Sequence, residues 1–280
     1  MTVQIVTDSA ADIPAETAAA LGIRVVPLSI RFGDEEFTDG VDLTTDAFYA
    51  KMASTDVFPS TAAPAPGAFE AAMREAGAGG DAVVCINLSA ALSATMQSAE
   101  NGARAIGDEL DVRVVDSQSI TAGLGMQIVA AAKLAADGAS ADDVVALIED
   151  LRGRTHVFGA LNSLDNLRKG GRIGGAQAMI GGLLSIKPII DISTGSVEEA
   201  SKQRTRRKSL TWLRDRLFQE PDLEHVALSS GGAKDVDELL DLISPRYSRE
   251  QVEIWSIGPV IGTHGGPEVI GFCWQDLPAS

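Results

Sequence analysis

Short apolar runs alternate with stretches of helical periodicity over the first half of the chain. The runs have the length of buried strands, and the stretches between them repeat apolar residues at helical spacing. The predicted strands are Val3–Thr7, Arg24–Ile30, Ala82–Leu88 and Val112–Asp116, and the predicted helices are Ala15–Leu21, Ala68–Ala76, Leu92–Ile106, Gly123–Asp137 and Ala141–Gly153. This rhythm is typical of βαβ units. It predicts a Rossmann-like α/β domain with a parallel sheet over residues 1–154.

After Arg154 the pattern changes to shorter strands and fewer helices. The predicted strands are Val157–Leu161, Ile186–Ile192, Ser196–Lys202, His225–Ser229, Gln251–Ser256 and Val269–Trp274, and the predicted helices are Leu164–Lys169, Ser209–Phe218 and Ala233–Ser244. The segment Asp191–Ser196 contains Ser-Thr-Gly and is typical of a hairpin turn. Residues 155–280 are therefore expected to form an α+β domain with a mostly antiparallel sheet.

Composition agrees with two α/β domains. The chain has 280 residues, more than one domain of ordinary size. Hydrophobic residues make up 45% and aromatic residues only 5%, so the interior must consist of small aliphatic side chains, which suits sheets covered by helices. With 23 basic and 39 acidic residues the formal charge is −16, which repels nucleic acid and anionic membrane surfaces. Nucleic acid is not expected as a partner.

Neither the cysteines nor the N-terminus indicates an exported or metal-binding protein. Cys85 and Cys273 each lie in an apolar run and are expected to be small buried residues, with no disulfide, metal or cofactor. The N-terminus opens directly on a predicted strand, and no apolar run reaches membrane-spanning length. We expect a cytoplasmic protein without an integral membrane segment.

Three polar residues are candidates for holding a small acidic group. Thr61 lies in a loop stiffened by prolines, and Ser93 follows a predicted strand and lies near the N-terminus of a helix, where backbone N–H groups favour an anion. His264 lies in a glycine-rich turn that can hold its ring at a cleft. These residues offer hydroxyl and imidazole groups rather than a formal cation. Their ordinary alternatives are a turn residue, a helix cap and a structural histidine.

Four further features each allow a functional and a structural interpretation. Asp8, directly after the first strand, either orients a site residue or caps the next helix. Gly170–Gly175 resembles a phosphate loop only in composition, because the Lys-Ser/Thr of a P-loop is missing. The apolar stretch Met179–Ile186 either lines a tunnel or packs in the core, and the basic run Lys202–Lys208 is either a helix start or a docking patch.

Taken in order, seven segments resemble the DegV family, the fatty-acid-binding subunits of bacterial fatty-acid kinase. They are Thr7–Ile13, Thr61 with its proline-rich turn, Leu92–Ala99, Val115–Ser117, Leu164–Ile173, Lys187–Ile189 and Ile257–His264. The resemblance covers nearly the whole chain. It implies a two-domain α/β protein that holds one long-chain fatty acid in a tunnel between the domains.

The resemblance also implies roles for individual residues. Thr61 and Ser93 would contact the carboxylate, with His264 nearby, and Arg204 would dock the kinase. The tunnel candidates are Met179, Ile180, Leu183, Leu184 and Ile186. Such a protein is not an enzyme by itself and needs no cofactor. It presents the carboxyl group to a separate ATP-dependent kinase, which makes an acyl phosphate for phospholipid synthesis.

This sequence departs from the family pattern at the expected head-group end. Ala62 stands where the family usually has serine, and Ser93-Ala94-Thr95-Met96 replaces Ser-Gly-Thr-Tyr. Ser229-Ser230 stands where many members carry a histidine. Two alternatives to a carrier remain. One is a hydrolase or phosphotransferase that acts on a small anionic substrate through Ser93 or His264, and the other is a regulatory module that binds a partner through Lys202–Lys208.

Overall fold

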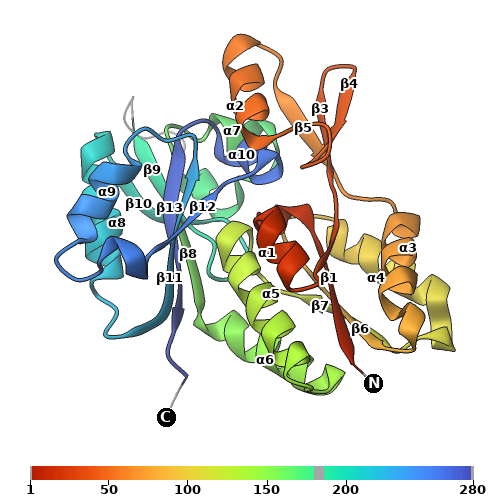
Figure 1. The fold of residues 1–280 in the computed structure, drawn as a ribbon. Coiled ribbons are helices and arrows are strands. Elements are labelled where there is room, and N and C mark those ends of the chain that lie inside the picture. Colours follow the sequence, from red (N-terminus) through yellow and green to blue (C-terminus); the bar gives the residue numbers. More distant parts are fainter. Residues whose placement is uncertain (1, 180–185, 279–280) are drawn as a thin grey trace.

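The computed structural model describes residues 2–179 and 186–278, which contain three sheets (Figure 1). The first sheet is parallel throughout, in the order β2-β1-β6-β7. Its strands are β1 (Val3–Asp8), β2 (Arg24–Val26), β6 (Ala82–Asn87) and β7 (Val112–Asp116). This is the predicted parallel sheet of the N-terminal half, and it confirms the predicted fold class there.

Helices cover both faces of the parallel sheet. Val83 and Cys85 of β6 point to one face and pack with α3 (Pro66–Ala76) and α4 (Thr95–Ile106). Val84 and Ile86 point to the other face, toward the cluster that contains residues of α5 (Thr121–Ala136) and α6 (Ala141–Arg154). Every residue of β6 is buried, which explains why its sequence reads as a continuous apolar run.

The second sheet has six strands in the order β10-β9-β8-β13-β11-β12. All neighbouring pairs are antiparallel except β11 and β12, which run parallel. Its strands are β8 (Thr155–Ala160), β9 (Lys187–Asp191), β10 (Glu198–Gln203), β11 (Leu223–Gly231), β12 (Glu253–Ser256) and β13 (Val269–Asp276). The mostly antiparallel sheet and the β9–β10 hairpin are therefore confirmed.

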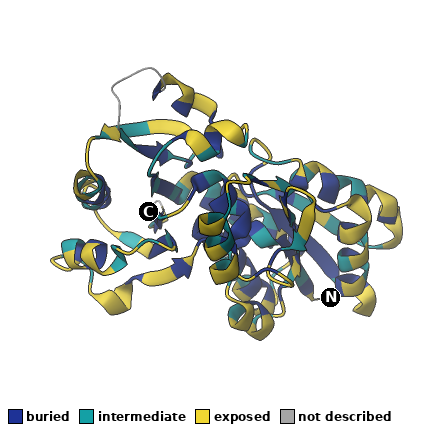
Figure 2. Cartoon of the chain, turned by 90° about the horizontal axis from the view of Figure 1, so that it is seen from above, coloured by how far each residue is buried: buried dark blue, intermediate teal, exposed yellow. Residues whose placement is uncertain are grey.

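One face of this second sheet packs under α8 (Arg206–Leu217) and α9 (Val236–Ile243), around Phe158, Phe272 and Trp274. The opposite face contributes Val157, Ala227 and Cys273 to the large cluster it shares with α5. Figure 2 shows the buried residues along the sheets and on the inward sides of the helices. The two large sheets thus meet across α5.

Close packing of α5 depends on its glycines. A Cβ atom at Gly123 would lie 2.5 Å from Val157 Cγ2, and one at Gly125 would lie 2.4 Å from the Trp255 ring. Both contacts are too short for any side chain, so α5 can approach the second sheet only because these residues are glycine. We propose that the domain boundary lies between α6, which follows α5 and ends at Arg154, and β8, which begins at Thr155.

A third, small sheet was not predicted. It has the order β4-β3-β5, with β3 (Ser29–Phe32), β4 (Glu35–Thr38) and β5 (Pro59–Ala62), and with α2 (Thr45–Ser54) it forms a lobe in Figure 1. The single strand predicted over Arg24–Ile30 is wrong, because the chain leaves the parallel sheet after Val26 and enters the small sheet at Ser29. The small sheet carries Thr61.

Short elements complete the described chain. They are α1 (Ala15–Ala20), α7 (Asp165–Lys169), α10 (Pro259–Gly265) and the 3-10 turns η1 (Ser9–Ala11), η2 (Gly77–Gly79), η3 (Gly107–Glu109), η4 (Gly174–Met179) and η5 (Arg249–Gln251). Among the described residues, no helix is both long and apolar enough to cross a membrane.

Candidate functional site

A partly enclosed, apolar cavity lies where the three sheets converge. It is lined by residues of β5, β8, β9, β11, β13, α5, α7 and α10 and of the loop between β6 and α4. The empty space between these residues is about 850 Å³, a volume that includes the part open to solvent. Aliphatic side chains make up most of the wall, among them Leu88, Leu92, Ile120, Ile190, Val197 and Val260. The cavity is therefore suited to an apolar ligand.

Thr61 and His264 meet at one end of this cavity. Thr61 Oγ1 on β5 lies 3.0 Å from His264 Nε2 on α10, and both residues line the wall. The predicted glycine-rich turn around His264 is wrong in detail, because Pro259 starts a short helix and His264 lies in its last turn. The predicted loop at Thr61 is an extended strand. The two segments come together although 203 positions separate these residues.

Burial sets the charge of this histidine. Burial, together with the smaller effect of the nearby Arg172 guanidinium, lowers the pKa of His264 to about 4. The imidazole is therefore neutral at pH 7. Its Nδ1 is buried and has no hydrogen-bond partner among the described residues. Gly170 packs directly on the ring, since a Cβ atom there would lie 2.3 Å from Nδ1.

Ser93 lines the same cavity from the segment that precedes α4. Its Oγ lies 2.9 Å from Thr95 Oγ1 and accepts a hydrogen bond of 3.2 Å from the Thr95 N–H. Since α4 begins at Thr95, the prediction that Ser93 lies beside a helix N-terminus is confirmed. The fold thus brings Thr61, Ser93 and His264, from three distant segments, to one cavity.

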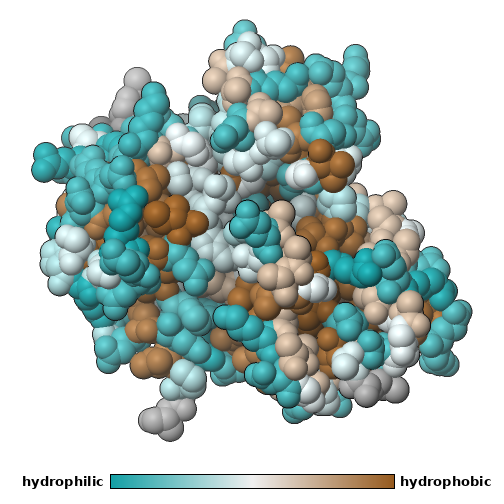
Figure 3. Space-filling model, viewed as in Figure 1, coloured by the Kyte–Doolittle hydropathy of each residue, from teal (hydrophilic) through white to brown (hydrophobic). Residues whose placement is uncertain are grey.

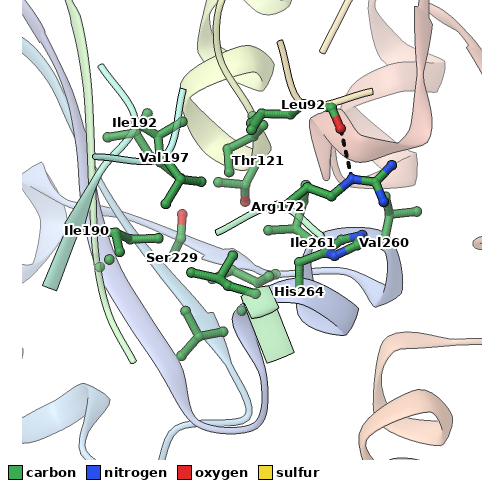
Figure 4. Close-up of a pocket in the computed structure, with 18 of the residues that line it drawn as sticks. Leu92, Thr121, Arg172, Ile190, Ile192, Val197, Ser229, Val260, Ile261 and His264 are labelled. Atoms are coloured by element: carbon green, nitrogen blue, oxygen red, sulfur yellow. Dashed lines mark hydrogen bonds between the residues drawn. The ribbon is translucent and has the colours of Figure 1, made fainter. Parts of the chain in front are cut away.

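Arg172 also lines the cavity and was missed in the sequence. Its Nε donates to the Leu92 carbonyl at 3.1 Å, and its Nη1 donates to the Gly170 carbonyl at 2.7 Å. Figure 4 shows the guanidinium beside His264, with the bond to Leu92. The described lining therefore includes a cation at the polar end, contrary to the expectation of neutral groups alone. The Gly-Gly-Arg segment was the available signal, but its composition suggested only a weak phosphate loop.

The predicted tunnel residues fall into two groups. Met179 is buried and Ile186 is partly buried in the core around the cavity, but neither belongs to its described lining. Ile180, Leu183 and Leu184 lie outside the described residues. The described wall comes instead mainly from strands and from the loop after β6, whose apolar residues cannot be told from ordinary core residues by pattern alone.

The geometry does not favour nucleophilic catalysis by Ser93. Its hydroxyl is hydrogen-bonded to Thr95, whereas the His264 imidazole is hydrogen-bonded to Thr61. A catalytic serine needs a base within hydrogen-bonding reach and a third group that orients this base. Within the described chain, no carboxylate is hydrogen-bonded to His264 Nδ1.

The basic run divides between structural and exposed residues. Thr205 caps α8, and Arg206 forms a bidentate ion pair with Asp235 at 2.6 and 2.8 Å. Arg204, Arg207 and Lys208 are exposed and form no ion pair with described residues. The helix-start interpretation is therefore confirmed for Thr205, while the docking patch stays a prediction for the exposed residues.

Fold and site together define an α/β protein that encloses an apolar cavity, with polar groups at one end, between a parallel and a mixed sheet. The family model described as "Uncharacterised protein, DegV family" matches residues 2–277, and the chain belongs to this family. The resemblance found in the sequence is thereby confirmed.

Relatives match over their full length. A DegV domain-containing protein of Halalkalibacterium halodurans is 32% identical over 97% of this chain and 98% of its own. The solved structure of a fatty-acid-binding DegV family protein from Thermus thermophilus is 32% identical with a TM-score of 0.91, covering 99% of this chain and 100% of its own. A stearic-acid-binding protein from Eubacterium ventriosum is 27% identical with a TM-score of 0.89, covering 98% of both chains.

Proposed function

We propose that this protein binds one long-chain fatty acid in the cavity and presents its carboxylate to a partner ATP-dependent kinase. The kinase would form the acyl phosphate for phospholipid synthesis, and this protein would act as a carrier without catalytic activity of its own. The observation that carries the proposal is the division of one cavity into a long aliphatic wall and a polar end. Family members of the same fold with bound fatty acids support it.

Burial of the acyl chain is the main source of affinity in this proposal. Each buried methylene contributes about 0.8 kcal/mol, so roughly fourteen methylenes contribute on the order of 11 kcal/mol before ordering costs. Hydrogen bonds to the carboxylate contribute roughly 1.5–3 kcal/mol each and chiefly set its orientation. The wall therefore holds the ligand, while the polar end positions it.

The polar end suits a carboxylate that must react. When the neutral His264 donates its Nε2–H to Thr61 Oγ1, the Thr61 hydroxyl can donate to the ligand, as can that of Ser93, and both leave the carboxylate ionised and nucleophilic. Arg172 uses two of its five N–H groups on backbone carbonyls, which fixes the guanidinium at this end and leaves its charge to act on the head group. Cys85 and Cys273 are unpaired, which agrees with a cytoplasmic protein.

The proposal is tested by identifying the ligand. Mass spectrometry of the purified, denatured protein should detect a long-chain fatty acid in about equimolar amount. The double substitution Thr61→Ala and Ser93→Ala should slow phosphorylation of the bound acid by the kinase far more than it weakens binding. Ser60→Ala, at the exposed neighbour on β5, is the matched control and should change neither. An empty protein that also fails to bind added fatty acid would overturn the proposal.

A further inference from the structure

Two hydroxyl groups lie in the apolar wall of the cavity, away from the polar end. Thr121, at the start of α5, and Ser229, on β11, both line the cavity and are only 3% and 2% exposed. In Figure 4 both oxygens are turned into the space bounded by Ile190 and Val197, whereas His264 and Arg172 lie on the opposite side. A plain alkyl chain at this place has no group to bond with them.

Thr121 Oγ1 has unused hydrogen-bonding capacity. The Asp12 carboxyl group is close enough to interact with it, but no hydrogen bond of normal length and angle joins this oxygen to any described residue. Three other buried hydroxyls in the described chain also lack a partner, those of Thr7, Ser119 and Tyr247, but none of them lines the cavity. Even a proton turned toward Asp12 leaves the lone pairs of Thr121 facing the ligand.

The Ser229 hydroxyl also has hydrogen-bonding capacity that is largely unused. Among the described residues, its only contact of hydrogen-bonding type is with the Cys273 thiol, at 3.8 Å between Oγ and Sγ. Burial raises the pKa of this thiol to about 12, so it is neutral and a weak partner. The neighbouring Ser230 shows the contrast, because its Oγ accepts a hydrogen bond of 3.1 Å from the Ala233 N–H.

The backbone at Thr121 is also unusual. Its φ angle is +45°, a left-handed conformation that β-branched residues rarely adopt. Such strain persists only where the surrounding structure imposes it, often at binding sites. At Thr121 the strained backbone carries a side chain with a hydroxyl group in an otherwise apolar wall.

We propose that the cavity selects a long-chain fatty acid that carries a hydroxyl group several carbons from its carboxylate, held between Thr121 and Ser229. A ligand hydroxyl can donate to one of these residues and accept from the other, which satisfies both. A buried hydroxyl left without a partner is unfavourable, so an unsubstituted chain gains less from the same cavity. This inference rests on the proposed function and specifies its substrate class.

The test measures binding by displacement of a fluorescent fatty acid. The competitors are octadecanoic acid and a series of monohydroxy octadecanoic acids that differ in the position of the hydroxyl. One position along the chain should bind about tenfold more tightly than the unsubstituted acid, while a hydroxyl next to the carboxylate should not. Equal or weaker binding of every hydroxy acid would overturn the inference. This is the result expected if an ordered water, rather than a ligand hydroxyl, satisfies Thr121 and Ser229.

Matched variants assign the preference to these residues. Thr121→Val keeps the β-branched shape at the strained position and should abolish the tenfold preference, measured as the ratio of the affinities for the hydroxy acid and for octadecanoic acid. Thr121→Ser keeps a hydroxyl and should retain the preference. Ser229→Ala is an independent second variant that should reduce it in the same way. If no acid binds at all, the proposed function itself fails, whereas binding without positional preference contradicts only this inference.

Discussion

Gly170 and His264 are the clearest case of residues that fix each other at the polar end. The ring lies against the Cα atom of Gly170, and its other side is hydrogen-bonded to Thr61. The residue types at this end, two hydroxyls and a histidine among glycines, were sufficient to select them from the sequence. Their mutual distances were not, because the contacts depend on how three distant segments fold together.

Gly170→Ala should therefore displace the His264 ring. A Cβ atom 2.3 Å from Nδ1 cannot be accommodated without moving a buried imidazole, so we expect a loss of about 1–3 kcal/mol in the free energy of unfolding. Binding of fatty acid should weaken as the bond to Thr61 is lost. Gly153→Ala in α6, where a Cβ atom meets nothing within 4 Å, is the control and should not destabilise the protein. Chemical denaturation measures the stability of both variants, and equal stability of the two would contradict this account.

At the scale of elements, the predictable parts were those with strong apolar patterns. The strands β1, β6 and β13 were found because nearly all their residues are buried, on both faces of the sheet. In contrast, β4 has the sequence Glu-Glu-Phe-Thr and no buried residue, so no pattern marks it. Arg172 and Thr121 were missed for a related reason, because a polar residue in a loop or at a helix start has no periodic signal that separates a cavity wall from the surface.

Three carboxyl groups lie where these elements join. Asp8 ends β1 and accepts hydrogen bonds from Leu88 N–H at 2.9 Å and from Asn87 Nδ2 at 3.2 Å. The same carboxylate caps the 3-10 turn η1 through Ala10 N–H, which confirms the capping interpretation of Asp8. Burial is the main reason why the pKa values of Asp8 and Asp39 are raised to about 6 and that of Asp12 is raised well above its ordinary value.

Asp39→Asn should stabilise the protein at neutral pH. Because the folded-state pKa of Asp39 is raised from 3.8 to about 6, its protonated form favours folding below about pH 4, and this contribution is lost as the pH rises through 6. Asparagine keeps a neutral side chain, so the variant should gain about 1–3 kcal/mol over the wild type above pH 6 and nothing near pH 3.5. His264 acts in the opposite direction, since its lowered pKa makes stability fall as the pH drops below 6.5 toward 4.

The difference between variant and wild-type unfolding curves cancels the contribution of His264. Asp8→Asn is the comparison, because an amide cannot accept all the bonds that the Asp8 carboxylate accepts from Leu88, Asn87 and Ala10. Its gain at neutral pH should therefore be smaller. A difference for Asp39→Asn that does not change between pH 4 and 7 would show that this carboxyl group is not responsible.

On the scale of the whole molecule, charge is distributed unevenly. The formal charge is −16, and Figure 3 shows polar residues over most of the outer surface on one face. Against this background, Arg204, Arg207 and Lys208 form an exposed basic group at the start of α8. A local cationic group on an acidic protein suits an acidic partner surface, and such contacts act mainly on the rate of encounter. This is the structural support for the proposed docking of the kinase at Arg204.

Arg204→Glu should reduce phosphorylation of the bound fatty acid by the kinase about tenfold at low salt, because charge reversal converts attraction into repulsion. The effect should shrink as ionic strength rises, since exposed charges are screened. Binding of the fatty acid itself should not change, because Arg204 is not among the residues that line the cavity. Lys133→Glu reverses an exposed charge near the C-terminal end of α5 and is the matched control. Equal phosphorylation rates for both variants and the wild type, measured with purified kinase and ATP, would rule out docking at this group.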